Sequence, residues 1–146
     1  MPFALSCKHE YALSALVELA AAYTSGQPIQ SRQLAGRQHI PDRYLEQLLA
    51  CLKRGGLVRS QRGVNGGYLL AREPMTISVL EVIHCIDGRD HSSSEHSLPP
   101  TVECSVVHEV WNEAQQSMEQ VLNHYSLKDL VEKRDNRQQT NRMYYI

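Results

Sequence analysis

The sequence predicts a mainly α-helical fold with a small two-stranded β wing. Two short amphipathic segments lie between residues 31 and 54 and end at Gly55-Gly56. Residues 57–70 follow, in which two short strand-like stretches flank a basic, glycine-rich loop, as in a β-hairpin. An apolar stripe follows in residues 103–125. This order of elements is that of a winged helix-turn-helix domain followed by a long dimerisation helix.

The first helix is predicted over about Ser6 to Tyr23. Apolar side chains recur there at three- and four-residue spacing, which places them on one helical face. The sequence Ser-Gly-Gln-Pro at residues 25–28 ends the helix. The apolar face consists of Tyr11, Ala12, Ala15, Leu16, Leu19, Ala20 and Tyr23.

Two helices are predicted to form the helix-turn-helix. Ser31 is expected to be the N-cap of a helix from Arg32 to Arg37. Its hydroxyl and the exposed amides at the helix start either hold a DNA phosphate or serve only as a cap. After a turn over residues 38–41, Pro41 or Asp42 opens a second helix, the candidate recognition helix, which ends at the glycine pair. The inward residues of this helix are expected to be Tyr44, Leu45, Leu48, Leu49 and Leu52.

The wing is predicted as two strands, Leu57–Ser60 and Tyr68–Leu70, joined by a polar loop. Asn65 and Gly66 are expected to supply the positive backbone dihedrals of a tight turn. Arg62 lies at the predicted tip, where an arginine side chain can enter a narrow minor groove.

Three further helices are predicted after the wing. The segment Thr76–Ile86 repeats a helical apolar pattern and begins with a Thr or Ser cap. The long helix Glu103–Tyr125 sustains its apolar stripe for about three heptads, a pattern typical of a helix that packs against a partner helix. A short helix, Leu127–Val131, is capped by Ser126.

These elements divide the chain into four parts. Polar composition separates the second and fourth parts from their neighbours, and the last part is expected to be a mobile polar tail. The predicted division is residues 1–86 for the DNA-binding domain, 87–102 for a sensor or cluster-type loop, 103–131 for the dimerisation helix with its short successor, and 132–146 for the tail.

Charge is unevenly distributed along the chain. The whole sequence has 15 basic and 16 acidic residues. Residues 30–72, however, contain eight Lys and Arg residues and two acidic ones, a net charge of +6, which leaves −7 for the rest of the chain. A basic segment that also carries a helix-turn-helix is the expected footprint of phosphate neutralisation. Double-stranded DNA is therefore the predicted partner, with a solvated basic face as the alternative.

Length and composition exclude several classes of protein. A chain of 146 residues with 42% hydrophobic content suffices for one domain with a core, or a small domain with a dimerisation arm, and leaves no room for a second, catalytic domain. No leader pattern and no apolar run of about 18 residues is present, so a cytoplasmic protein that does not enter the membrane is expected. Cys7, Cys51, Cys85 and Cys104 are scattered, unlike the cysteines of zinc sites or disulfide scaffolds. Cys7 and Cys51 are assigned to packing and Cys85 to burial in its helix.

Candidate DNA contacts follow from the chemistry of the exposed side chains. At the start of the recognition helix, Arg43 suits guanine, Gln47 suits adenine and Glu46 suits cytosine. Tyr44 is better suited to a phosphate or to the methyl group of thymine. The other candidates are Ser31, Arg32 and Arg59 for the DNA backbone, and Arg62, Asn65 and Gly66 for the wing contact.

Three sequence blocks carry a resemblance to a known family. They are Tyr-Ala-Leu at residues 11–13, Ile-Pro-Asp-Arg-Tyr-Leu-Glu-Gln-Leu-Leu at 40–49, and Gly-Gly-Leu-Val-Arg-Ser-Gln-Arg-Gly-Val-Asn-Gly-Gly-Tyr-Leu-Leu at 55–70. Over about residues 3–131 the chain resembles the Rrf2 family of bacterial winged helix-turn-helix transcriptional regulators. The resemblance implies a homodimer with a long antiparallel dimerisation helix. Such a dimer would bind a roughly palindromic operator with half-sites about one helical turn apart.

Several members of this family carry an iron–sulfur cluster on three cysteines in the loop before the long helix. In this chain only Cys104 stands at such a position, and the rest of the loop contains no cysteine. An ordinary three-cysteine cluster is therefore not expected. Because imidazole can replace thiolate in cluster chemistry, a variant iron–sulfur site with non-standard ligands stays open, and it would sense iron or redox state. The candidate ligands are Cys104, His96 and His91, with Glu10 from the partner subunit. The alternative is a solvated histidine-bearing loop with one leftover cysteine.

Two alternatives to a cluster-containing DNA-binding regulator are considered, a thiol enzyme and a cluster-free regulator. A thiol enzyme would pair Cys104 with His108, four residues later on one helix. The sequence has no oxyanion-hole glycine motif, and the glycine loop at 63–67 lacks the ending of a phosphate-binding loop, so the protein is predicted not to be an enzyme. The second rival is a cluster-free regulator controlled by a small molecule or a protein partner, since some cluster-free family members bind a metabolic enzyme.

Overall fold

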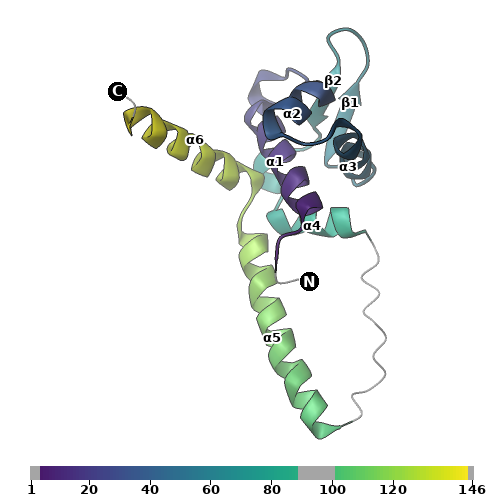
Figure 1. Cartoon of the computed structure of the whole chain (residues 1–146), viewed down its shortest axis with the longest axis vertical. Coiled ribbons are helices and arrows are strands. Elements are labelled where there is room, and N and C mark those ends of the chain that lie inside the picture. The colour runs from purple at the N-terminus through teal and green to yellow at the C-terminus, as the bar shows by residue number, and fades with distance from the viewer. Residues whose placement is uncertain (1–3, 89–100, 145–146) are drawn as a thin grey trace.

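The computed structural model describes residues 4–88 and 101–144, which form helices and one antiparallel two-stranded sheet. Helices α1 to α4 and the sheet lie together at one end of the molecule, and α5 and α6 extend away from them in different directions (Figure 1). The elements in chain order are α1 (Cys7–Ala21), the 3₁₀ turn η1 (Tyr23–Ser25), α2 (Ser31–Gln38), α3 (Asp42–Arg54), β1 (Val58–Gln61), β2 (Gly67–Leu70), η2 (Pro74–Thr76), α4 (Val79–Asp87), α5 (Val102–His124) and α6 (Leu127–Tyr144).

The core forms around α1, which contacts α2, α3, α4, α6 and β2. The helix has small and branched apolar residues at the predicted spacing, so Ala12, Ala15 and Leu16 are fully buried. From α3 the core receives Leu45, Leu48, Leu49 and Leu52, and from the wing it receives Leu57, Val58 and Leu70. The wing is thereby fixed to the same core as the two helices of the helix-turn-helix.

A buried histidine joins the start of α1 to the end of α4. Ser6 caps α1, and its Oγ lies 2.7 Å from Nδ1 of His9. The other ring nitrogen, Nε2, lies 2.6 Å from Oδ1 of Asp87. Since His9 is only 4% exposed, these hydrogen bonds satisfy both of its buried ring nitrogens. No sequence pattern predicted this link, because its partners are far apart in the chain.

The two wing strands pair in an antiparallel register that sets Val58 opposite Leu70 and Gln61 opposite Gly67. Ile29 adds an antiparallel bridge to Tyr68, which connects the segment before α2 to the wing. Gly67 has a φ of +149°, and a Cβ placed there would lie 2.5 Å from the backbone oxygen of Ile29. Only glycine fits this close approach of two backbones.

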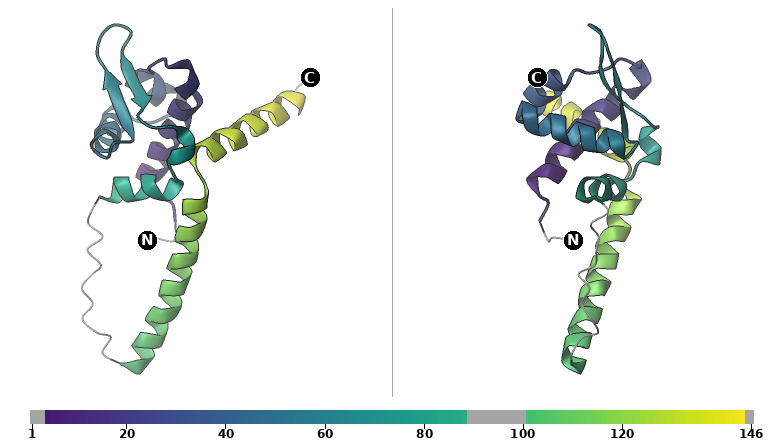
Figure 2. Two further views of the ribbon diagram at one scale, coloured as in Figure 1. Left: turned by 180° about the vertical axis from the view of Figure 1, so that it is seen from behind. Right: turned by 90° about the vertical axis from the view of Figure 1, so that its right-hand side faces the viewer.

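Helix α5 projects from the rest of the molecule, and its start lies far from α1 (Figures 1 and 2). It is held at its C-terminal end, where the N–H of Val79 donates to the carbonyl of Tyr125 and the N–H of Leu127 donates to the carbonyl of Ile77. None of its residues is buried within the chain. At the first turn, the N–H of Cys104 donates to Oγ1 of Thr101, the N-cap residue.

The prediction for the end of the chain was wrong, because helix α6 is longer than expected. A short helix ending at Val131 and a mobile tail were expected, but α6 continues to Tyr144. Leu130 and Val131 pack against the core and anchor its first turns. The polar remainder has no apolar periodicity, yet it is free of Gly and Pro and rich in residues with good helix propensity. The division of the chain into four functional parts stays a prediction.

Three other local predictions were wrong. Ser31 is the first helical residue of α2, and Gln30 occupies the N-cap position without a side-chain cap. The positive φ angles of the wing fall on Gly63 and Gly67 instead of Asn65 and Gly66. The predicted helix from Thr76 starts only at Val79, although the expected serine cap is confirmed in Ser78, whose side chain accepts from the N–H of Glu81.

Cys7 was assigned to packing, but it is exposed. It stands at the first position of α1, where the chain has not yet reached the core.

Among residues 4–88 and 101–144, no helix is both long enough and apolar enough to cross a bilayer.

Candidate nucleic-acid interface

The outward face of α3 presents a row of polar side chains at its N-terminal half. Arg43, Glu46 and Gln47 are exposed, while the four leucines of the same helix are buried. This follows from helical periodicity, since residues three and four positions apart share a face. The predicted base-reading residues are therefore brought together on one surface.

Tyr44 is placed differently from its polar neighbours. It is half-buried, and its ring meets that of Tyr11 edge to face with 5.7 Å between centroids. Such pairs stabilise contacts between elements, so Tyr44 fixes α3 against α1.

A left-handed residue forms the turn between α2 and α3. His39 has a φ of +55° and ends α2, and the N–H of Ile40 donates to the carbonyl of Ala35. The buried side chain of Ile40 then anchors the turn. Sequence reasoning located this turn but did not identify His39, because non-glycine residues rarely adopt this conformation.

The start of α2 lies beside the wing. Nε2 of Gln30 donates to the carbonyl of Val64 in the wing loop at 3.4 Å. Ser31 is half-buried and Arg32 is exposed. The predicted backbone contacts of α2 and the wing loop therefore belong to one surface.

The wing exposes most of its predicted contact residues. Arg59, Arg62 and Asn65 are exposed, whereas Gly66 is buried in the loop. A Cβ at Gly66 would lie 2.2 Å from the backbone oxygen of Gln61, so its role in the loop is steric. Lys53 at the end of α3 donates from Nζ to Oγ of Ser60 on β1 at 2.7 Å, which connects α3 to the wing.

Two of the eight basic residues in 30–72 are engaged elsewhere. Arg37 lies 3.5 Å from the carboxylate of Glu18 on α1. Arg72 forms an ion pair with Glu81 on α4 at 2.5 Å, and the hydrogen bond to that carboxylate raises the pKa of the guanidinium. These arginines connect elements of the fold and leave the other cations to define the basic surface of α2, α3 and the wing.

The predicted iron–sulfur ligands are not gathered in the part of the chain that the structure describes. His91 and His96 lie outside the described residues. Cys104 is half-buried in the first turn of α5, at the end of that helix away from α1, which carries Glu10. In residues 4–88 and 101–144, no three His, Cys, Asp or Glu side chains are placed to hold a metal ion. The described donors alone do not fit a cluster.

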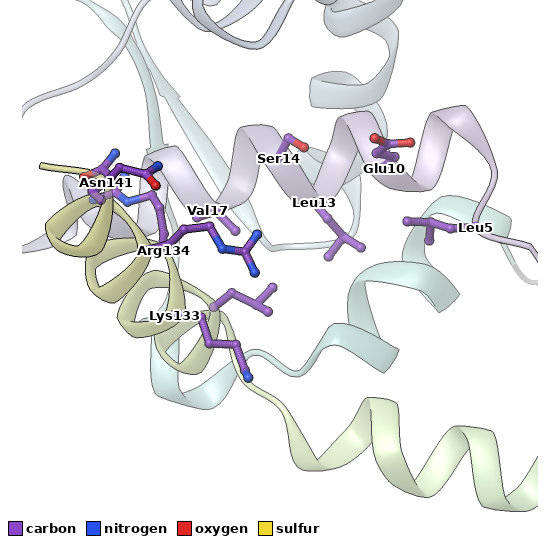
Figure 3. Close-up of a pocket in the computed structure, with 11 residues that line it drawn as sticks. Leu5, Glu10, Leu13, Ser14, Val17, Lys133, Arg134 and Asn141 are labelled. Atoms are coloured by element: carbon purple, nitrogen blue, oxygen red, sulfur yellow. The ribbon is translucent and has the colours of Figure 1, made fainter. Parts of the chain in front are cut away.

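Glu10 instead lines a groove between α1 and α6 with a volume of about 660 Å³ (Figure 3). Apolar side chains of α1, including Leu13 and Val17, form one wall, and Lys133 and Arg134 of α6 stand opposite. A ligand role for Glu10 therefore requires a second subunit whose α5 brings a donor to this groove.

Comparisons with known proteins agree with this geometry. Residues 5–133 match the family model Rrf2, described as an iron-dependent transcriptional regulator. The chain is 39% identical over 132 residues to a Mycobacterium tuberculosis protein classed as an HTH-type transcriptional regulator, with 87% of this chain and 80% of the relative covered. It is also 32% identical to the HTH-type transcriptional regulator CymR of Bacillus subtilis, over 97% of this chain and 99% of that one.

Solved structures give the same result. The IscR of T. potens superposes with a TM-score of 0.79 at 35% identity, covering 94% of this chain and 93% of that one. The global cysteine regulator CymR of B. subtilis superposes with a TM-score of 0.77 at 30% identity, covering 90% of this chain and 98% of that one. These relatives are regulators and not enzymes, which agrees with the prediction from sequence. The chain belongs to the Rrf2 family of winged helix-turn-helix, DNA-binding transcriptional regulators.

Proposed function

We propose that this regulator binds a roughly palindromic operator as a homodimer, with α3 of each subunit in the major groove. The observation that carries the proposal is the polar face of α3, on which Arg43, Glu46 and Gln47 stand exposed while the opposite face is held by four buried leucines. The wing is hydrogen-bonded both to Gln30, just before α2, and to Lys53 at the C-terminal end of α3. An exposed polar helix face beside a basic wing is the arrangement that reads base edges.

The side chains divide by the part of DNA that they reach. Arg43 donates to guanine, Gln47 pairs with adenine and Glu46 accepts from cytosine. Arg32 and Arg59 neutralise phosphates on either side, and Ser31 supports the backbone contact at the start of α2. At the wing tip, Arg62 enters the minor groove and Asn65 contacts its edge, while Gly66 keeps the loop compact.

The case for a homodimer rests on α5. Large apolar side chains along this helix are exposed in the single chain: Val107 at 68%, Val110 at 62% and Val121 at 57%. A contiguous exposed apolar stripe of this kind marks an interface. A second copy buries it by packing its own α5 antiparallel, since an isologous pair covers both stripes at once.

Salt dependence of DNA binding tests the DNA-contacting surface. The wild-type chain is titrated against double-stranded DNA by fluorescence anisotropy at several salt concentrations. Each phosphate contact contributes about 0.9 to the negative slope of log affinity against log salt. In a dimer, Arg32→Ala removes one such contact per subunit and should reduce the slope by about two. An unchanged slope would remove Arg32 from the interface, and a wild-type protein without DNA affinity would refute the proposal.

The variant iron–sulfur site is a separate prediction within this function. With Cys104, His91, His96 and the partner subunit's Glu10 as ligands, protein purified without oxygen should contain equal amounts of iron and acid-labile sulfide. It should also absorb in the near-ultraviolet and visible range. Both signals should disappear in Cys104→Ala and persist in Cys7→Ala, whose exposed thiol lies on α1. An iron-free, colourless wild-type protein that still binds DNA would contradict this site.

The alternative signal is a small molecule or a metabolic-enzyme partner. The groove between α1 and α6 and the exposed face of α6 are surfaces that such a partner could contact without touching α3. As a regulator of genomic DNA, the protein is proposed to act in the cytoplasm.

A further inference from the structure

Two cysteines meet between the recognition helix and α4. Sγ of Cys51, on α3, lies 3.4 Å from the carbonyl oxygen of Cys85, and Sγ of Cys85, on α4, lies 3.7 Å from the carbonyl oxygen of Cys51. Each thiol therefore reaches the backbone of the other residue. The two helices come close enough at this point for short side chains to meet.

Gly55 makes room for this contact. A Cβ at Gly55, the C-cap of α3, would lie only 2.3 Å from Sγ of Cys85. The sulfur thus occupies the space beside the glycine, one turn beyond Cys51. The Cys85 sulfur therefore packs directly against the C-terminal end of α3, and a displacement of Cys85 changes this contact.

The pair is accessible and separate from the other thiols. Cys51 and Cys85 are each half-buried, so a small oxidant can reach them. Cys7 begins α1 and Cys104 lies in the first turn of α5. Neither belongs to the contact between α3 and α4.

We propose that Cys51 and Cys85 form a reversible disulfide on reaction with a hydroperoxide, and that this bond between α3 and α4 lowers the affinity of the protein for DNA. The second part rests on the proposed function, in which α3 reads the operator. The sequence predicts packing for Cys51 and burial for Cys85, and it does not predict their contact, because 34 positions separate them and no motif joins them.

The chemistry balances with a hydroperoxide as oxidant. The thiolate of Cys51 attacks one peroxide oxygen, a sulfur–oxygen bond forms, the oxygen–oxygen bond breaks, and the leaving oxygen takes a proton. The Cys85 sulfur then attacks Cys51, the sulfur–sulfur bond forms, and water leaves with the second oxygen. Two thiols lose two electrons and two protons, and the peroxide is reduced to water or to an alcohol and water. Burial and the neighbouring Cys51 raise the pKa of the Cys85 thiol, which disfavours its thiolate as the first nucleophile.

The bond acts on DNA binding through the position of α3. Closing the sulfurs to about 2.05 Å draws the C-terminal half of α3 toward α4. Four core leucines fix the helix in a close-packed interior, so it moves as a unit. Gln47 lies one turn before Cys51 on the same helix, and a small displacement there disrupts hydrogen bonds to base edges.

The test uses the full-length protein, reduced and then treated with hydrogen peroxide. Mass spectrometry of the non-reduced digest should find the peptides of Cys51 and Cys85 joined, with the mass of two hydrogen atoms lost. Affinity for DNA, measured on the same samples, should fall about tenfold and return after treatment with dithiothreitol.

Matched variants test whether this pair causes the response. A Cys7→Ala variant keeps the pair and should respond as the wild type does. Cys51→Ala and Cys85→Ala should bind DNA when reduced and lose the response. Two unlinked thiols in the treated wild type would overturn the disulfide, and a linked pair with unchanged affinity would overturn its effect on DNA binding. If the reduced protein binds no DNA, the proposed function fails, while the digest still decides whether the bond forms.

Discussion

Arg43→Ala is expected to weaken binding to the operator by about 1–3 kcal/mol, roughly tenfold to a hundredfold in affinity. Arg43 is exposed in the first turn of α3, and its side chain is free to pair with a guanine edge. The loss should be concentrated on the specific site. Binding of the variant to unrelated DNA should change little, and discrimination at the contacted base pair should relax.

The matched comparison is Arg32→Ala, which removes the same charge from the start of α2. Because a phosphate contact carries no sequence information, that variant should weaken binding to all sequences by similar factors. Competition titrations with operator and unrelated duplexes distinguish the two patterns. If Arg43→Ala loses equal affinity on every sequence, Arg43 is a phosphate contact and its base-reading role is refuted.

Val110→Glu is expected to convert the proposed dimer into a monomer. Val110 is 62% exposed in the single chain and lies in the apolar stripe of α5. Burying two carboxylates near the centre of an antiparallel helix pair costs several kcal/mol. Operator affinity should then fall by about a hundredfold or more, since two half-sites no longer bind as one unit. Sedimentation velocity and operator titration measure both effects.

Asn112→Glu provides the control on the same helix. It adds the same charge two residues later, on the opposite side of α5, and Asn112 is exposed. This variant should stay dimeric and bind DNA normally. A Val110→Glu protein that also stays dimeric would place the interface elsewhere than on the stripe.

Sequence patterns predicted the elements whose spacing reflects burial. The apolar faces of α1, α3 and α5 have the helical period, and the glycine pair at 55–56 ends α3 as expected. The end of α6 was missed because its polar turns have no period to detect. The wing glycines were misassigned because the approach of Ile29 to Gly67, which requires glycine there, is a tertiary contact.

The residues of the candidate site also fall into two groups, those whose exposure the sequence predicts and those whose contacts it does not. The exposure of Arg43, Glu46 and Gln47 follows from the helical position of the leucines, so it could be predicted. The ion pair that holds Arg37 on Glu18 and the meeting of Cys51 with Cys85 depend on how helices pack, which local patterns do not encode. These contacts decide which basic residues form the basic surface and which cysteines can react.

Footprinting of the purified full-length protein on duplexes selected for binding from a random-sequence pool tests the central claim most directly. The account predicts two protected half-sites related by a two-fold axis, about one helical turn apart on one face of the DNA, with two chains bound per site. A single protected half-site, or protection without sequence preference, would contradict a homodimer that reads an operator through α3.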